Sequence, residues 1–285
     1  MRYERGFTLV ELLTALVLFG IVGTALYQLL VSNQRVYRQQ SERVAVNENA
    51  RAAISILPGE IRELSAGGGD VIAMTATSLS YKAMQGLYLQ CQLPNTGSLQ
   101  LTLDRTNVFG LRGMDPGRDS VLVFAENDPS TRGDDAWLHA DVTAMATGTA
   151  CPGARPSLTI TLAGVTAGQL GGVENGAPVR THQPAQVLLY QDAAGAWWLG
   201  GRMFMKGSGW SATQPIVGPV SSTGLALSYF DVAGNVTANP AAVARVGIAV
   251  ESRSARAVRG TGGAYPGYML EDLMTHVAVR NNPLY

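Results

Sequence analysis

Glu11 is the only formal charge in an apolar run that extends from Phe7 to Val31. In the hydrocarbon of a membrane, a carboxylate costs on the order of 3 kcal/mol at the centre and less towards the ends. A nearby positive charge would offset that cost, because hydrocarbon strengthens the attraction between opposite charges. Glu11 would then have a functional partner. The alternative is an ordinary signal anchor with an acid near the interface.

The two cysteines, Cys91 and Cys151, both lie beyond the apolar run. If this part of the chain is exported, an oxidising compartment permits a disulfide between them. Closing a loop of about 60 residues would contribute roughly 4 kcal/mol in the chain-entropy model. We expect the two thiols to pair, and the alternative is that they are unrelated buried thiols.

The remaining residues give no recognisable catalytic or metal-binding set. With the two cysteines, the histidines give no zinc-ligand spacing, and phosphate-loop, nucleophile-elbow and dinucleotide-binding motifs are absent. The acids of a turn-rich region lack the spacing of an EF-hand, so we expect solvated turn residues, with calcium binding as the alternative. We therefore expect no enzyme, no metal and no cofactor. The histidines are His139, His182 and His276, and the acids are Asp115, Asp119, Asp128, Asp134 and Asp135.

The formal net charge is zero, which predicts no broad electrostatic surface for nucleic acid. A local patch of Arg245, Arg253, Arg256 and Arg259 is the alternative. A nucleic-acid partner is therefore not expected.

Trp197 and Trp198 are adjacent in a β-rich run, so their side chains should point to opposite faces of a strand. We expect one ring to pack beneath a helix. The other ring would be covered by a loop or would contact a partner subunit, since an exposed tryptophan in an assembly protein is a candidate hot spot.

The apolar run must form the element that presents Glu11. Residues 7–31 would rise about 37 Å as a helix, enough to cross a hydrocarbon core of about 30 Å. Arg2 and Arg5 precede the run, which predicts a cytoplasmic N-terminus and a translocated remainder. A secretory signal peptide would instead have a shorter apolar core that ends at a small-residue cleavage site.

The string GFTLVELL, with Gly6, Phe7 and Glu11, resembles the class III signal of the type IV pilin superfamily. The resemblance implies a leader of residues 1–6, cleavage between Gly6 and Phe7 by a prepilin peptidase, and methylation of Phe7. It also implies that Glu11 meets the N-terminal amine of a neighbouring subunit. Such an amine is mostly cationic at neutral pH and would supply the positive charge that Glu11 requires. An uncompensated Glu11 would therefore favour docking of the neighbouring subunit in one axial register.

Residues 32–64 are expected to continue the helix. Ala50, Ile54, Leu57, Ile61 and Leu64 form one apolar stripe at helical spacing, which predicts docking on a sheet, with a coiled-coil dimer as the alternative. Pro58 should kink the helix or start a new turn, because proline removes a backbone donor.

Residues 65–285 are expected to form an extracytoplasmic β-rich head domain. The glycine-rich stretch at residues 65–69 marks the boundary, and short β-rich runs separated by turns follow it. One hairpin should close at residues 192–195, and the last strand should lie in VAVRN. The predicted fold is α+β: a long N-terminal helix, membrane-spanning in its first half, packed on an antiparallel β-sheet head domain.

The segments NENARAAISIL and GLALSYFDVAGNV and the late VRN resemble PilW-like minor pilins and J-type minor pseudopilins of type II secretion, and the chain length favours the PilW-like side. The resemblance implies a subunit of the cytoplasmic (inner) membrane that later joins a pilus or pseudopilus. It would prime assembly or sit at the tip. Its implied partners are other minor and major pilins or pseudopilins, the prepilin peptidase and the inner-membrane assembly platform. The alternatives are a secretion pseudopilin, an adhesin or DNA-uptake tip protein, and a membrane-anchored enzyme.

Overall fold

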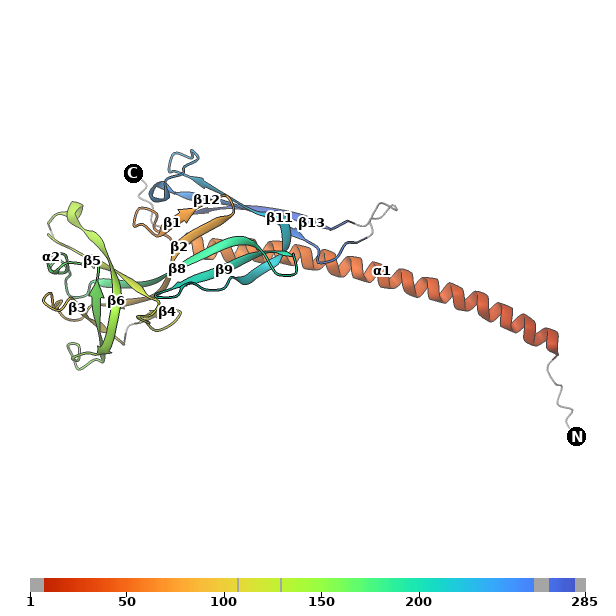
Figure 1. The fold of residues 1–285 in the computed structure, drawn as a ribbon, viewed down its shortest axis with the longest axis horizontal. Coiled ribbons are helices and arrows are strands. Elements are labelled where there is room, and N and C mark those ends of the chain that lie inside the picture. The colour runs from red at the N-terminus through yellow and green to blue at the C-terminus, as the bar shows by residue number, and fades with distance from the viewer. Residues whose placement is uncertain (1–7, 107, 129, 259–266, 280–285) are drawn as a thin grey trace, which may run out of the picture.

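One long helix precedes a β domain in the computed structural model, which describes residues 8–106, 108–128, 130–258 and 267–279. The helix α1 (Leu9–Arg62) has 54 residues, which corresponds to a length of about 80 Å. Its N-terminal half extends away from the strands, and its C-terminal half lies along them (Figure 1). The predicted α+β fold is therefore confirmed.

The helix begins at an N-cap, Thr8, whose side-chain oxygen accepts a hydrogen bond of 3.3 Å from the backbone amide of Glu11. It then runs through Pro58 and ends at Arg62, short of the expected end at residue 64.

The buried face of α1 differs in part from the predicted stripe. Ala53 is fully buried, whereas Ile54 is only half-buried. Two alanines on this face, Ala50 and Ala53, leave room for the helix to approach the sheet closely. The buried residues of the helix are Val46, Ala50, Ala53, Leu57 and Ile61.

Most of the longer strands follow the predicted β-rich runs. The strands at Val71–Met74, Phe109–Gly110, Ala136–Thr147 and Gly209–Trp210 were not predicted, and the last described strand begins at Leu270, ahead of the VAVRN segment. The strands are β1 (Val71–Met74), β2 (Ser78–Leu89), β3 (Gln100–Asp104), β4 (Phe109–Gly110), β5 (Ser120–Ala125), β6 (Ala136–Thr147), β7 (Ser157–Ala163), β8 (Pro178–Gln191), β9 (Trp197–Met205), β10 (Gly209–Trp210), β11 (Gln214–Phe230), β12 (Arg245–Arg253) and β13 (Leu270–Ala278). Three short helices, η1 (Arg132–Asp134), α2 (Ala167–Leu170) and η2 (Pro240–Ala242), lie between them.

The strands form one antiparallel sheet in the order β13-β12-β11-β9-β8-β5-β6-β7-β3. The sheet branches at β8. One edge of β8 pairs with β2 along its length, whereas the other edge pairs with β5 near its start and with β9 near its end. The helix α1 packs on β11, β12 and β13.

The branch divides the buried apolar residues into two clusters. The proximal core joins α1 to the strands beside it, and its members lie at residues 53–83 and 185–279. Every buried member of the distal core lies between Tyr88 and Val179. The chain leaves β2 at Leu89 and returns at Pro178, and these two residues are register partners. The distal core is therefore built from one continuous segment whose two ends are neighbours.

Candidate functional site

The N-terminal processing residues Gly6 and Phe7 lie outside the described residues. Glu11 is described, and it lies in the first turn of α1 with its side chain exposed. The neighbouring apolar side chains are also exposed, among them Leu12 and Leu13. By length and composition, this part of α1 can cross a membrane, and none of its most apolar window is buried inside the protein. The carboxylate of Glu11 therefore belongs to a bare apolar surface that a neighbouring helix can reach.

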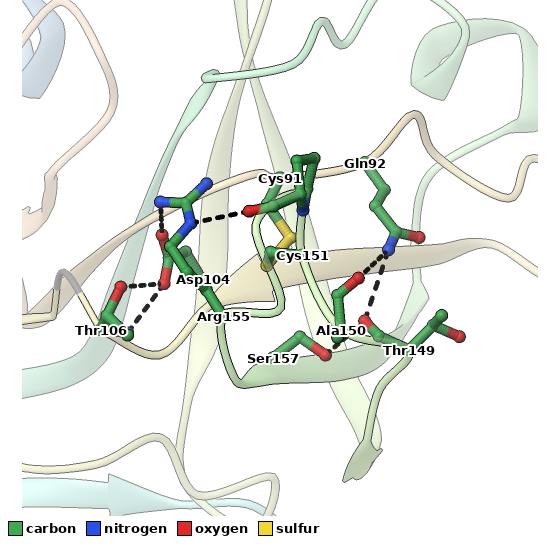
Figure 2. Close-up of a disulfide and its surroundings, with 10 residues drawn as sticks. Cys91, Gln92, Asp104, Thr106, Thr149, Ala150, Cys151, Arg155 and Ser157 are labelled. Carbon is green, nitrogen blue, oxygen red and sulfur yellow. Dashed lines mark hydrogen bonds and ion pairs between the residues drawn. A yellow bond between two sulfur atoms is a disulfide. The ribbon is translucent and has the colours of Figure 1, made fainter.

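The two cysteines form a disulfide within the segment that connects β2 to β8. Cys91 and Cys151 are bonded, with their Cα atoms 5.5 Å apart (Figure 2). The guanidinium of Arg155 pairs with the buried carboxylate of Asp104, which anchors the turn after Cys151 to the end of β3. On the other side, the amide of Gln92 donates a hydrogen bond of 2.8 Å to the carbonyl of Ala150. The disulfide is thus surrounded by polar interactions that join segments far apart in the chain.

The two tryptophans occupy different environments, and both are half-buried. Trp197 packs against the proximal core. The indole Nε1 of Trp198 donates a hydrogen bond of 2.8 Å to Oδ2 of Asp192, which lies in the turn between β8 and β9. Backbone hydrogen bonds from that turn, that of Ala196 foremost, and the indole bond lower the pKa of Asp192. The ring of Trp198 is therefore partly covered by its own turn, and a contact of either ring with a partner subunit stays a prediction.

The histidines are far apart in the sequence, but the sheet brings His139 and His182 together. The rings of His139 on β6 and His182 on β8 have centroids 5.2 Å apart. His182 is only 3% exposed, and neither ring nitrogen has a hydrogen-bond partner among the described residues. Burial, reinforced by the positive charge of Lys82, lowers the pKa of His182 to about 3. His182 is therefore neutral at physiological pH.

A cleft lies beside this histidine pair, at the junction of the two cores. Its walls include Met84, which is the register partner of His182, and Leu122, which is the register partner of His139. The guanidinium of Arg180 is held there between the buried carboxylate of Asp70, 3.4 Å away, and the ring of Trp137, whose centroid is 5.7 Å away. The cleft has a volume of about 730 Å³ and is lined by Glu63, Ser65, Gly68, Met84, Leu122, Trp137 and Arg180.

The acids of the turn-rich region have separate local roles. Asp119 is buried and forms a bidentate ion pair with Arg112, with both N–O distances 2.7 Å. Asp115 and Asp128 accept hydrogen bonds from backbone amides within their own turns, those of Gly117 and Ser130. Asp134 and Asp135 lie in and just after η1. Within the described ranges, no three His, Cys, Asp or Glu side chains are grouped as metal ligands.

The arginines near β12 do not gather into one patch. Arg245 and Arg253 lie at opposite ends of the strand, and each guanidinium stacks on an aromatic ring, that of Phe230 and of Tyr268 respectively. Arg256 lies beside α1, and Arg259 is outside the described residues.

Comparison with known proteins identifies one region of the chain. A family model described as the prokaryotic N-terminal methylation motif matches residues 1–27, which include Gly6, Phe7 and Glu11. No curated protein and no solved structure matches the chain. The matched motif supports a pilin-like or pseudopilin-like protein that a prepilin peptidase processes and that assembles with other pilins. The bare apolar half of α1 is consistent with membrane anchoring of such a protein.

Proposed function

We propose that this pilin-like protein is a minor, PilW-like subunit that primes assembly of a type IV pilus or sits at its tip. The observation that carries the proposal is Glu11, a lone exposed carboxylate on the apolar half of α1, inside the methylation motif. Cleavage between Gly6 and Phe7 would create the amine that such a carboxylate requires.

Assembly would proceed by pairing between helices. The described side chains next to Glu11 on α1, such as Leu12 and Leu13, are apolar, so a neighbouring subunit with a free N-terminal amine gains most when it docks in one register. Exposed apolar residues along the helix, such as Phe19 and Val22, would then be covered by helices of the neighbours. Glu11 thus determines the register, while the apolar surface supplies the contact area.

The β domain supports a low-copy, non-enzymatic role. It extends well beyond the helix through the distal core, and a head of this size would pack poorly as the repeating subunit of a thin filament (Figure 1). We propose that its surfaces make selective contacts with other minor subunits at one end of the filament.

The first test is the intact mass and N-terminal sequence of the protein recovered from its native membrane. We expect a chain that starts at Phe7 with a methylated amine. A chain that still starts at Met1 in cells with active prepilin peptidase would contradict the proposal. Co-isolation with secretion-system pseudopilins in place of pilus subunits would instead assign the chain to the J-type class.

A further inference from the structure

Two hollows meet on one side of α1, where its apolar run ends. The first is a shallow groove of about 560 Å³ whose walls include Leu26, Leu29 and Leu30. The second is a cleft of about 430 Å³ whose walls include Arg35 and Arg256. Tyr37 and Arg38 line both hollows. An apolar groove therefore passes directly into a basic cleft.

The second wall of the basic cleft comes from the connection between β12 and β13. Its described residues Arg256, Ala257 and Val258 line the cleft beside α1. The backbone amide of Ala255 donates a hydrogen bond of 3.0 Å to Oε2 of Glu42 on the helix. The hydroxyl of Ser254 then donates a bond of 2.7 Å to the carbonyl of Arg256. These bonds hold Arg256 opposite the helix.

The cleft carries an excess of positive charge. Arg35, Arg38 and Arg256 contribute three guanidinium groups, and Glu42 is the only acid in the lining. No described carboxylate lies within ion-pair distance of any of the three arginines. The cleft is therefore complementary to an anion with several oxygen atoms, such as a phosphate group.

The position of the cleft along the helix selects the source of that phosphate. Along the helix axis, Arg35 lies about 6 Å and Arg38 about 10 Å beyond Val31. The headgroup layer outside the hydrocarbon is about 5–7 Å thick on each side, and arginine side chains extend several ångströms towards it. If the apolar run fills the hydrocarbon, the basic cleft lies at headgroup depth and the leucine groove lies among the acyl chains.

We infer that the joined hollows bind one anionic phospholipid of the membrane. An acyl chain would lie along Leu26, Leu29 and Leu30, and the phosphate would be held by Arg35, Arg38 and Arg256. This assignment rests on the membrane anchoring in the proposed function. An acidic segment of a neighbouring subunit is the rival occupant, but it would leave the leucine groove without an apolar ligand.

The test uses the full chain purified in detergent and exposed to phosphatidylglycerol or phosphatidylcholine. Retained lipid is measured by native mass spectrometry. We expect preferential retention of phosphatidylglycerol and a loss of about 30-fold in its affinity in the double variant R38Q/R256Q, since two arginines are removed from an anionic headgroup. The variant R38K/R256K should regain most of the affinity. The matched control R51Q/R62Q removes two exposed arginines of α1 outside the cleft and should bind lipid normally.

Equal loss of lipid in R38Q/R256Q and in R51Q/R62Q would overturn the site. Displacement of the lipid by glycerol phosphate alone at the same concentration would also overturn it, because a free anion would then suffice. Normal lipid binding by R38Q/R256Q, with loss of a partner subunit, would assign the cleft to that subunit. Alkaline extraction of the membranes distinguishes membrane anchoring from the lipid site. Release of the unsubstituted chain would refute membrane anchoring. A chain that stays in the membrane but shows no lipid preference would refute only the lipid site.

Discussion

The imidazole rings of His139 and His182 lie 5.2 Å apart, one on each side of β5. The register of three strands creates this contact. Ser120 of β5 pairs with His182 on one side and with Asp141 on the other, so the face that carries both histidines also carries an acid. The amino group of Lys206 lies 3.2 Å from Asp141 and offsets that acid. Protonation of the buried His182 would therefore add a poorly compensated charge.

This arrangement predicts a loss of stability in acid that originates at His182. Its pKa is lowered to about 3 in the folded protein, below the ordinary value of 6.5, so the unfolded chain binds the proton more tightly. The contribution of neutral His182 to the free energy of unfolding is complete above about pH 6.5, and it decreases as the pH falls towards 3. At pH 5 the free energy of unfolding should be lower by about 2 kcal/mol for this reason. Urea unfolding at pH 7 and pH 5 measures it.

The variant H182Q should lack this part of the acid dependence, while other titrating groups still contribute. Substitution of the exposed His276, as H276Q, provides the control and should leave the acid dependence unchanged. The same loss between pH 7 and pH 5 in H182Q and in the unsubstituted chain would show that His182 is not the source.

Docking of the helix on the sheet should depend on Leu57. This side chain is 2% exposed and belongs to the proximal core, whereas the adjacent Ile56 is 43% exposed. We expect L57A to lower the free energy of unfolding by about 2–5 kcal/mol and I56A by less than about 1 kcal/mol. Urea unfolding of the full chain in detergent compares them. Similar losses in both variants would mean that the helix does not dock on this face.

The disulfide should stabilise the distal core by constraining the unfolded chain. The bond closes a loop with a sequence separation of 60 residues, for which the chain-entropy model gives about 4 kcal/mol. The double variant C91S/C151S should lose stability of that order. Reductant should lower the unfolding midpoint of the unsubstituted chain and leave that of the double variant unchanged. A midpoint that is insensitive to reductant in both proteins would contradict the prediction.

Glu11 should be required for assembly but not for processing. The variant E11Q keeps the shape of the side chain and removes its charge, which leaves the neighbour's amine unpaired in a desolvated site. Because loss of one partner of a buried ion pair costs about 3–5 kcal/mol, incorporation into the filament should fall to about a hundredth or less. Quantitative immunoblotting of sheared filaments and membranes measures this ratio.

A control in the same helix is T24V, which removes a hydroxyl that donates a hydrogen bond to the carbonyl of Ile21. It should be processed and incorporated normally. If E11Q is incorporated as well as T24V, the acid does not contribute to assembly.

Local features of the fold could be predicted from the sequence. The turn between β8 and β9 is one, because Gly195, at φ +82°, can adopt a conformation that other residues rarely do, and Asp192 accepts the amides around it. The long helix is another, since its apolar run lacks a helix breaker. The strand β6 was missed although its sequence carries a local signal: Leu138, Ala140 and Val142 are buried and alternate with exposed polar residues, which is the period-two pattern of a half-buried strand.

In the candidate site, too, some features could be predicted from the sequence and others depend on the tertiary structure. Glu11 could be recognised because its chemistry depends on a charge within one apolar run. The histidine pair could not, because its contact requires the registers of β5 with both β6 and β8. The choice of Ala53 over Ile54 as a buried helix residue is also a tertiary effect, since helical spacing accommodates either, and close approach to the sheet favours the smaller side chain.

The pairing of Leu89 with Pro178 has a consequence for how such a protein can diversify. The segment that forms the distal core leaves β2 and returns at β8 at one place, so its loops can lengthen, shorten or change in sequence without moving α1 or the strands on which the helix packs. Selection on the outer surface of the β domain is thereby separated from selection on the helix. One helical scaffold can in this way present many different outer surfaces.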